Sequence, residues 1–357
     1  MRTIKVGVVG IGAIAHIFHL PNYKNHSQVE LAAVADIDFG RAQQAAEQWG
    51  AVAYKSAEAM FREAGLDAVS ICTFNASHAE LAIAALEAGL DVLVEKPMTA
   101  TAEEAERLVQ TAERTGRILM VGMSSRYRYD VSALKGIVDS GELGDIYFAK
   151  ARIIRRRGVP KGWFTSKELS GGGPMMDIGV HALDAVWWLM GMPEPDNVLG
   201  KLFHRIAPYE TKGNGFYEAA STDNKVEPAI YDVEDFGTAY ITFENGTALT
   251  VEASWAANGA QDDAMKIELY GTKGGVSLDP LFLFKESNLV PVESRLQVES
   301  NDYYKDEIDH FVQCVIRREQ PLSGARQGLT IMRILDAIRI SSETNSAAKA
   351  KAASAIQ

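Results

Sequence analysis

The chain has 357 residues, of which 47% are hydrophobic and 23% are charged, a balance typical of a globular protein with ordinary hydrophobic cores. Its formal net charge of −11 argues against nucleic acid or an anionic membrane surface as a partner. A chain of this length favours two domains over one.

The first third of the chain alternates short apolar runs with Ala- and Glu-rich segments of helical spacing. Apolar runs without polar alternation are typical of parallel strands buried on both faces, and they lie at residues 4–9, 29–35, 68–73, 91–94 and 118–121. Helical spacing is clearest between them at residues 39–48, 77–88 and 101–115. This alternation predicts a doubly wound parallel sheet, and we expect it to form a first domain over residues 1–124.

Capping residues support the helices expected at 77–88 and 101–115. Ser77 and Thr101 are suitable N-caps, and Glu80 and Glu104 follow them by three residues, as in a capping box. Glycines suited to the left-handed conformation that often ends a helix stand at Gly65, Gly89 and Gly116.

After about residue 124 the pattern changes, and we expect a second α/β domain over residues 125–344. The patterns there predict a helix, a strand, a Gly-rich loop and a second helix, at residues 131–140, 146–154, 155–174 and 178–190. Strands dominate from 198 to 290, where Asn245-Gly246 is a strong hairpin signal, so this sheet is expected to be largely antiparallel. Two helices near 302–318 and 327–342 follow, and the Ala-, Lys- and Ser-rich residues 345–357 are expected to be frayed.

The turn after the first apolar run has the form G-x-G-x-x-A over residues 10–15. Gly10 allows a tight turn, Gly12 lets a pyrophosphate approach the backbone, and the small Ala15 lets the following helix pack close to the strand. Ala13 and Ile14 open that helix, whose free N–H groups and positive dipole end favour a phosphate. The turn therefore predicts dinucleotide binding.

Asp36 ends the second apolar run at the distance from the turn that a dinucleotide site requires. Its carboxylate can bind the ribose hydroxyls and would repel a 2′-phosphate, so NAD is expected as the cofactor and NADP is disfavoured. Arg41 lies near enough to accept a phosphate, and Asp36 could also be an ordinary carboxylate at a strand end.

Two further segments carry candidate catalytic groups. Lys96, in Glu95-Lys96-Pro97, directly follows the fifth strand, and strand carboxyl ends face the ligand crevice in such sheets. Asp177 and His181 are four residues apart and share one face of a helix that follows a Gly-rich loop. Oxidation of an alcohol needs a proton acceptor, which Lys96, Asp177 and His181 together could supply. A His–Asp pair at this spacing is more often structural, and without a third ligand we expect no metal.

These motifs, in this order over nearly the whole chain, resemble the Gfo/Idh/MocA oxidoreductases, a family that includes glucose–fructose oxidoreductase and inositol dehydrogenase. The motifs are G-I-G-A-I-A at 10–15, C-T-F-N-A-S-H at 72–78, E-K-P at 95–97 and D-I-G-V-H-A-L-D at 177–184. The resemblance implies a Rossmann domain followed by an α/β domain with an open, mostly antiparallel sheet. It also implies pairing of subunits through that sheet, as dimers or tetramers. The family often has Pro where Phe74 stands.

The resemblance also implies roles for individual residues. It places Lys96, Asp177 and His181 in the active site, with His181 as the proton acceptor. Glu95 and Lys96 would lie at the reactive end of the cofactor, and the family's cofactor loop implies contacts near the ribose and nicotinamide for Thr73, Asn75 and His78.

Substrate contacts are expected from residues that border the crevice. Arg126 and Tyr127 follow the last strand of the first domain, and one of them is expected to touch the substrate. Arg155 could contact hydroxyls or a phosphate, although a solvated loop or a subunit contact explains it equally well. Trp163 could stack on a sugar face, and Trp255 is a weaker candidate.

The predicted function is transfer of a hydride between a nicotinamide cofactor and a secondary alcohol of a sugar, inositol or related polyol. The alternative is an NAD-dependent glycosidase that oxidises its substrate transiently to permit elimination. A third class, regulators that sense nucleotide or sugar, is expected to have lost Lys96, Asp177 or His181.

The expected compartment is the cytoplasm. The two cysteines, Cys72 and Cys314, cannot form a disulfide framework, and reduced thiols suit that compartment. Arg2, Lys5 and the apolar residues 6–15 could pass for a signal peptide, but the glycines among them fit a strand and turn better. No apolar run approaches the ~18 residues that span a bilayer.

Overall fold

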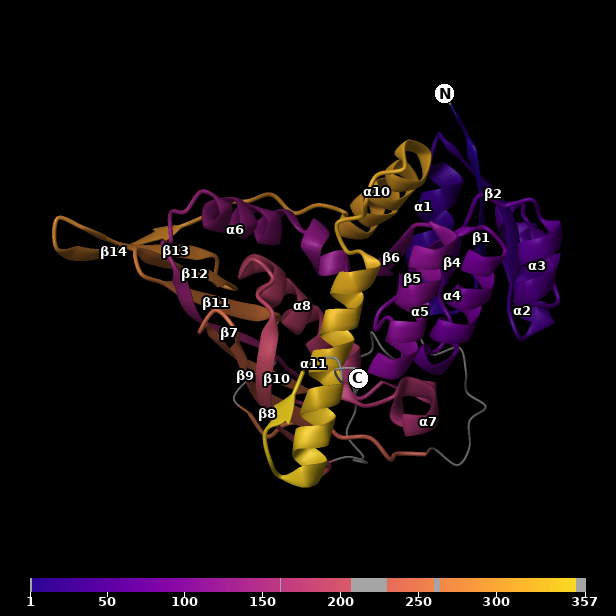
Figure 1. Cartoon of the computed structure of the whole chain (residues 1–357). Helices are drawn as coiled ribbons and strands as arrows, with labels where there is room; N and C mark the ends of the chain where they lie inside the picture. The colour runs from indigo at the N-terminus through magenta and orange to yellow at the C-terminus, as the bar shows by residue number, and fades with distance from the viewer. Residues whose placement is uncertain (1, 161, 207–229, 260–263, 351–357) are drawn as a thin grey trace.

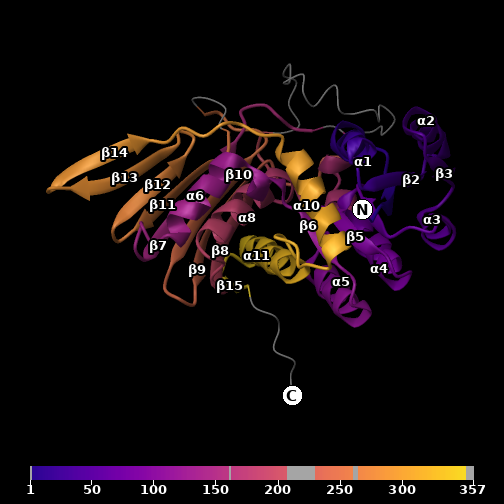
Figure 2. The same ribbon diagram turned by 90° about the horizontal axis from the view of Figure 1, so that it is seen from above.

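The computed structural model describes residues 2–160, 162–206, 230–259 and 264–350, in which two sheets lie side by side (Figures 1 and 2). The first sheet is parallel and has the order β3-β2-β1-β4-β5-β6. Its strands are β1 Ile4–Val9, β2 Val29–Ala35, β3 Val52–Tyr54, β4 Ala68–Ile71, β5 Asp91–Glu95 and β6 Leu119–Gly122. This order confirms the predicted doubly wound sheet. Strand β3 was not predicted, because it is only three residues long and half-exposed.

Helices cover both faces of this sheet. The first two in the chain are η1 Ala15–His19 and α1 Leu20–Asn25. The others are α2 Phe39–Trp49, α3 Ala57–Glu63, the short η2 Asn75–Ser77, α4 His78–Glu87 and α5 Ala102–Thr115. Thr101 and Glu104 form the predicted capping box at α5. The box predicted at Ser77 is wrong, because that hydroxyl bonds Thr73 Oγ1 and the Phe74 carbonyl instead of the start of α4.

The second sheet has nine strands in the order β14-β13-β12-β11-β7-β10-β9-β8-β15, and all neighbours are antiparallel except β7 and β10. Its strands are β7 Ile146–Ile154, β8 Pro195–Phe203, β9 Phe236–Phe243, β10 Ala248–Ser254, β11 Lys266–Gly271, β12 Gly274–Leu278, β13 Phe282–Ser287, β14 Val290–Arg295 and β15 Ala348–Lys349. The open, mostly antiparallel sheet is therefore confirmed.

Helices pack on one face of the second sheet, chiefly α6 Tyr129–Asp139, α8 Val180–Leu189 and α11 Ala325–Thr344 (Figure 1). Small and branched residues face them, such as Ala149, Ala151 and Ile241, which are almost fully buried. The long α11 also packs against α5, so it joins the two sheets (Figure 2). The remaining helices are η3 Ser124–Tyr127, η4 Gly162–Thr165, α7 Lys167–Ser170, η5 Met175–Gly179 and α10 Tyr303–Arg317.

Two segments differ from the simple division expected at residue 124. Helix α10 lies within the expected second domain, yet its Phe311 and Val312 share a core with Ile4 and Val6 of β1. The chain therefore returns to the first sheet before α11. The tail expected to be frayed contains β15, which pairs with β8, and residues 351–357 lie outside the described residues. No helix in the described ranges has both the length and the apolar composition needed to cross a bilayer.

Candidate active site

The turn after β1 has the geometry that its glycines predict. Gly10 has φ +85°, and a Cβ there would lie 2.7 Å from the carbonyl carbon of Cys72, so no larger residue fits. A Cβ at Gly12 would meet nothing within 4 Å, which leaves the backbone open to a ligand. Ala13 and Ile14 begin the helix that continues through η1 and α1. This open backbone at a helix start suits a pyrophosphate.

Asp36, at the end of β2, lies beside the same turn. Its side chain is mostly buried, with Oδ2 accepting the Ile11 N–H at 2.7 Å and Oδ1 accepting the Asp38 N–H at 2.8 Å. The Arg41 guanidinium lies 3.6 Å from the Asp38 carboxylate. The open Gly12 and the fixed Asp36 carboxylate together fit a dinucleotide.

The cofactor loop after β4 is fixed mainly by buried side chains. His78 is fully buried, with Nδ1 at 2.9 Å from the Pro97 carbonyl and Nε2 at 3.1 Å from the Thr73 carbonyl. Burial lowers the pKa of His78, and a neutral imidazole donates to only one of these carbonyls at a time. Asn75 is also buried and donates to the Ser170 carbonyl at 2.7 Å. These contacts hold the loop in place, and the cofactor contacts expected of Asn75, His78 and the partly exposed Thr73 stay predictions.

Glu95 likewise turns into the protein. Its Oε1 lies 2.8 Å from His19 Nε2, and its Oε2 accepts the Lys96 N–H at 3.2 Å. Burial would raise the pKa of Glu95, but His19 and the Lys96 charge bring it below its usual value. Glu95 therefore fixes the loop that carries Lys96, and its predicted place at the cofactor is not what the structure shows.

Lys96 and Asp177 come together across the two domains. The Lys96 ammonium donates to the Asp177 backbone carbonyl at 2.9 Å and to its Oδ1 at 3.2 Å. The indole N–H of Trp255 donates to Asp177 Oδ2 at 3.0 Å. Burial would raise the pKa of Asp177, but Lys96, then Arg155, and these hydrogen bonds lower it. Asp177 is therefore a carboxylate that holds a cation at the carboxyl end of β5.

His181 lies beside this pair on the same helix. Burial, and then the Lys96 charge, lower its pKa to about 3. Its Nδ1 is buried and has no hydrogen-bond partner among the described residues. At neutral pH the ring is thus unprotonated and can accept a hydrogen bond from a substrate hydroxyl, next to a cationic ammonium.

Of the residues predicted to contact the substrate, Arg155 lies close to these groups and Trp163 borders the cofactor loop. The charge of Arg155 lowers the pKa values of both Asp177 and His181, which places this arginine close to them. Trp163 stacks on Phe164 at 4.0 Å between ring centroids and tilts against Phe74 at 6.5 Å. Since Phe74 directly follows Thr73, this aromatic group borders the cofactor loop.

The other two predicted substrate residues are buried in the protein. Arg126 is 1% exposed and forms a two-pronged ion pair with Asp184, with Nε–Oδ2 at 2.8 Å and Nη2–Oδ1 at 2.6 Å. Tyr127 is 9% exposed and packs its ring against His310 at 5.5 Å. Neither side chain is presented to the crevice, so the structure gives both a structural role instead.

Glu234 is a residue of this site that the sequence analysis missed. Its carboxylate accepts the N–H groups of Gly173 at 2.9 Å and Met175 at 3.2 Å, at the start of the helix that carries Asp177. A signal existed, because Gly171-Gly172-Gly173-Pro174 offers no Ser, Thr, Asp or Asn to cap that helix. A cap had to come from elsewhere in the chain, although its position could not be read from the sequence.

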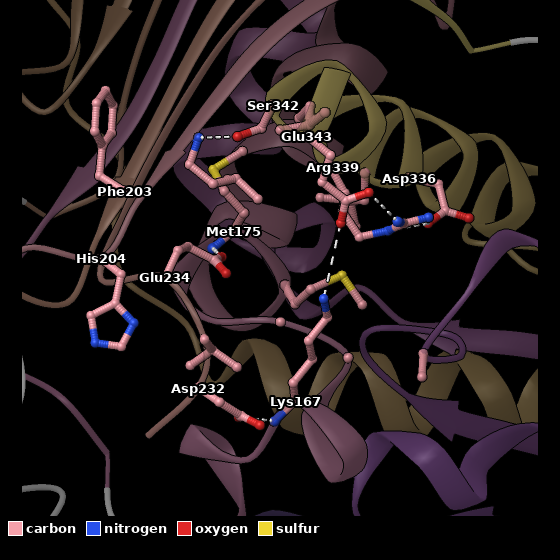
Figure 3. Close-up of a pocket in the computed structure, with 18 of the residues that line it drawn as sticks. Lys167, Met175, Phe203, His204, Asp232, Glu234, Asp336, Arg339, Ser342 and Glu343 are labelled. Carbon is pink, nitrogen blue, oxygen red and sulfur yellow. Dashed lines mark hydrogen bonds and ion pairs between the residues drawn. The ribbon is translucent and has the colours of Figure 1, made fainter. Parts of the chain in front are cut away.

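A cavity of about 230 Å³ lies on the other side of the Gly-rich loop (Figure 3). Glu234 and Met175 line it together with residues of α7, β8 and α11, whereas Lys96 and His181 do not. Its rim carries Lys167 and Arg339 among carboxylates (Figure 3). The cavity is therefore separate from the catalytic groups and adjoins them only through the loop.

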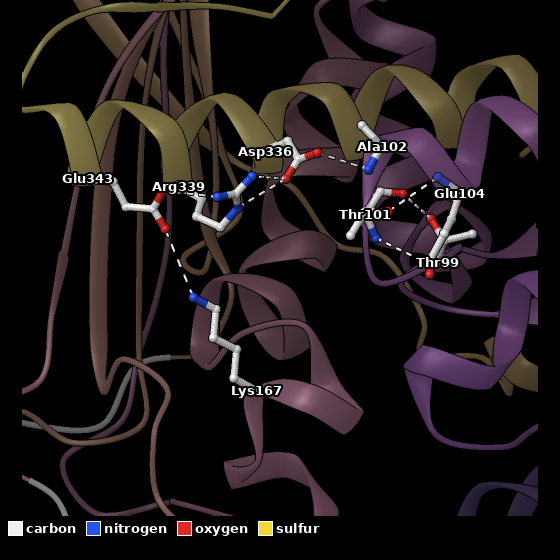
Figure 4. Close-up of polar contacts among 8 residues, drawn as sticks. All are labelled: Thr99, Thr101, Ala102, Glu104, Lys167, Asp336, Arg339 and Glu343. Carbon is white, nitrogen blue, oxygen red and sulfur yellow. Dashed lines mark hydrogen bonds and ion pairs between the residues drawn. The ribbon is translucent and has the colours of Figure 1, made fainter.

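Polar contacts beside this cavity link α11 to the first domain (Figure 4). Asp336 accepts the Ala102 N–H at the start of α5 at 3.0 Å and pairs with Arg339 at 3.1 Å. Arg339 pairs in turn with Glu343 at 3.0 Å, and Lys167 Nζ lies 4.0 Å from the same carboxylate. These contacts help to fix the domains relative to each other, as a site built from both domains requires.

Comparison with known proteins adds independent evidence. Residues 4–123 match the oxidoreductase family with an NAD-binding Rossmann fold, GFO_IDH_MocA, and residues 131–277 match the GFO/IDH/MocA C-terminal domain. The chain is 34% identical over 348 residues to the D-glucoside 3-dehydrogenase of Escherichia coli K12, with 96% of each chain covered. It is 28% identical over 331 residues to the scyllo-inositol 2-dehydrogenase (NAD(+)) of Bacillus subtilis 168, covering 89% of this chain and 88% of the relative.

The fold is also that of a solved structure, levoglucosan dehydrogenase in complex with NADH. The TM-score is 0.82 at 21% sequence identity, and the match covers 98% of this chain and 100% of the other. The names of these relatives describe dehydrogenases, and none of the three supports the alternative of a glycosidase that uses transient oxidation.

Proposed function

The chain belongs to the Gfo/Idh/MocA oxidoreductase family, and we propose that it oxidises a secondary alcohol of a sugar, inositol or related polyol with NAD as hydride acceptor. The observation that carries the proposal is the grouping of Lys96, Asp177 and His181. A cation, its carboxylate partner and an unprotonated imidazole stand at the carboxyl end of β5, in the crevice where such sheets bind ligands.

Each of these side chains has a distinct part in the reaction. The Lys96 ammonium binds the substrate hydroxyl oxygen and stabilises negative charge as the carbonyl forms. Asp177 holds that ammonium in place, and the His181 imidazole takes the hydroxyl proton as general base. Bound NAD supplies the ring carbon that accepts the hydride. The alcohol thus loses a proton to His181 and a hydride to the cofactor, and becomes a ketone.

The residues that would hold the cofactor are the turn at Gly10 and Gly12, the helix start at Ala13 and Ile14, and Asp36. Because the Asp36 carboxylate would meet a 2′-phosphate with like charge, NAD is proposed over NADP. Asp36→Ser should weaken NAD use and bring the kcat/KM for NADP closer to that for NAD. An enzyme that prefers NADP before the substitution contradicts this choice.

D-glucosides are proposed as the first substrates to test, with oxidation at carbon 3, because the E. coli relative of that name matches 96% of the chain. NAD reduction is followed by absorbance with glucosides, free sugars, inositols and sugar acids, and NADP is tested in parallel. Reduction with glucosides and not with inositols supports the proposal, and the reverse pattern replaces it with an inositol dehydrogenase. No reduction in any arm, with NAD bound, contradicts the proposed function itself.

His181→Ala provides the matched control for this assay. The substitution should lower turnover by orders of magnitude and leave NAD affinity nearly unchanged, since His181 acts on the substrate proton. Full retained activity would remove His181 from the role of general base.

We also propose that copies of the chain pair through the uncovered face of the second sheet. Leu199 of β8 and Tyr240 of β9 are neighbours on that face and are 57% and 46% exposed. Exposed apolar side chains on an open sheet are typical of an interface. Light scattering after size exclusion should show a dimer or tetramer that Tyr240→Glu dissociates, and a wild-type monomer contradicts this assembly.

A further inference from the structure

The helix that carries Asp177 and His181 begins without a capping side chain of its own. Its N-cap is Pro174, which makes no side-chain hydrogen bond, and three glycines precede it. The first N–H groups of a helix need acceptors from outside. Glu234, 57 residues further along the chain than Asp177, supplies both of its carboxylate oxygens to the Gly173 and Met175 N–H groups.

The Asp177 carboxylate is held by a second set of hydrogen bonds. Its two carboxylate oxygens are divided between two donors, Oδ1 with the Lys96 ammonium at 3.2 Å and Oδ2 with the Trp255 indole at 3.0 Å. A rotation of the carboxylate breaks at least one of these bonds. The indole therefore holds the carboxylate in the plane that keeps one oxygen facing Lys96.

Trp255 is in turn fixed by its surroundings. The side chain is fully buried, the backbone N–H of Trp255 donates to the Asp235 carbonyl at 3.0 Å, and the backbone carbonyl of Trp255 accepts the Gly158 N–H at 2.8 Å. Asp235 directly follows Glu234 in the chain. Two adjacent residues thus bind the helix start and the backbone of Trp255 (Figure 3 shows Glu234 beside Met175).

We propose that Glu234 and Trp255 are positioning residues for the reaction: Glu234 fixes the start of the catalytic helix, and Trp255 fixes the Asp177 carboxylate that holds the Lys96 ammonium. This inference rests on the proposed function. Neither residue touches the substrate, and both act through Asp177. The competing interpretation is that Trp255 only fills the core and Glu234 only caps a helix.

Trp255→Phe separates the two interpretations, because phenylalanine keeps an aromatic ring and removes the N–H. Trp187→Phe is the matched control, since Trp187 is buried on α8 and donates its indole N–H to the Pro193 carbonyl at 2.8 Å, away from Asp177. Trp255→Phe should lower kcat by roughly 10- to 100-fold, as misplaced catalytic groups do. Trp187→Phe should leave kcat within about threefold, a span of only ~0.7 kcal/mol in the barrier.

Two further readouts distinguish positioning from structure. NAD affinity should be equal in both variants and the wild type. Loss of the indole donor should raise the pKa of Asp177, so the acidic limb of the kcat profile should move to higher pH in Trp255→Phe alone. If the two tryptophan variants lose the same stability and share one kcat and one pH profile, Trp255 has no positioning role.

Glu234→Gln tests the proposed role of Glu234, and it remains informative if Trp255→Phe does not fold. The amide keeps the shape but turns an NH₂ group toward one of the two N–H donors. Asp232→Asn is its control, because Asp232 lines the same cavity but accepts the Lys167 N–H at the start of α7 at 2.6 Å. We expect about tenfold lower kcat for Glu234→Gln and little change for Asp232→Asn. Equal kcat in these two variants overturns the proposal for Glu234, whereas a wild-type enzyme that oxidises no sugar or polyol overturns the proposed function instead.

Discussion

Two ion pairs bind one helix of the second domain to segments that follow strands of the first sheet, and the two pairs have different roles. Lys96 follows β5 and pairs with Asp177, whereas Arg126 follows β6 and pairs with Asp184. The two aspartates are seven residues apart on the same helix, two turns along, so both face the same side. In sequence both cations are basic residues after a strand of the first domain, and the sequence does not show which of them is buried in an ion pair.

The difference lies in how completely each cation is satisfied. The side chains of Arg126 and Asp184 are 0% and 2% exposed, and the guanidinium also donates to the Leu322 carbonyl at 2.7 Å and to Gln327. The side chains of Lys96 and Asp177 are 17% and 11% exposed. Among the described residues the Lys96 ammonium binds Asp177 alone, through two contacts, and a third donor remains for a substrate oxygen. A pair whose donors are all bound within the protein stabilises the fold, whereas a pair with a donor left over can bind a substrate.

Removal of the Lys96 charge should give the largest effect. Lys96→Met is expected to lower kcat by about 10³-fold or more, since the developing negative charge loses its partner. The melting temperature should fall less than after removal of Arg126, because the Lys96–Asp177 pair is partly open to water and the Trp255 indole still binds Asp177. Steady-state turnover and calorimetry measure the two effects. Near-normal turnover would falsify the assignment of Lys96 as the cation of the site.

Removal of the Arg126 charge should mainly lower the stability and leave turnover nearly unchanged. Arg126→Met leaves Asp184 buried without its partner, and the loss is expected to be about 3–5 kcal/mol of the free energy of unfolding. The kcat of the folded enzyme at low temperature should stay close to normal. Urea unfolding and active-site titration separate these quantities. Arg126→Met/Asp184→Leu should recover much of the stability, because the uncompensated charge is gone; an equal or larger loss in the double variant speaks against this account.

Local spacing in the sequence predicted the doubly wound parallel sheet and the turn at Gly10, and the resemblance to the family predicted the grouping of Lys96, Asp177 and His181. Parallel strands place their carboxyl ends at one edge, and a separation of four residues places Asp177 and His181 on one helix face. The same reasoning placed Arg126 and Tyr127 at the substrate, since both begin near that edge. It could not show that Asp184 and Leu322 turn Arg126 inward, because those contacts are set by tertiary packing.

For a related reason, the sequence did not show which contacts Ser77, Asn75 and His78 make. Ser77 matched the pattern of a capping box, but the η2 turn directs its hydroxyl to Thr73 and Phe74. Asn75 and His78 belong to a motif near the cofactor, yet burial directs them to backbone carbonyls. A motif identifies the loop, whereas the side chains that hold the loop and those that face the ligand separate only in three dimensions.

Lys96→Arg sharpens the comparison, because it keeps the charge and changes the number of donors left over. A guanidinium opposite Asp177 should adopt the two-pronged geometry of Arg126 with Asp184 and point fewer donors at the substrate. We expect kcat to fall by roughly 10- to 100-fold, which is ~1.4–2.7 kcal/mol in the barrier. The measurement is kcat beside that of Lys96→Met. Activity equal to the wild type would mean that charge alone matters at this position.

The smallest expected effect is on the pKa of His181, which depends on the charge of Lys96 and not on that of Arg126. Burial, and then Lys96, lower its pKa to about 3, so folding favours the neutral ring. A histidine whose pKa is lowered by folding contributes stability that is present above its unfolded pKa of about 6.5 and is lost as the pH falls toward 3. Lys96→Met should raise the pKa of His181 and make this loss of stability at low pH smaller, whereas Arg126→Lys should leave both the pKa and the loss unchanged.

Nitrogen-labelled histidine spectra, with His181→Asn for assignment, measure the pKa of His181 directly. If His181 titrates near 6.5 in the wild type, or shifts equally in the two variants, the Lys96 pair is not the charge that His181 faces, and the contrast between the two ion pairs no longer explains the site.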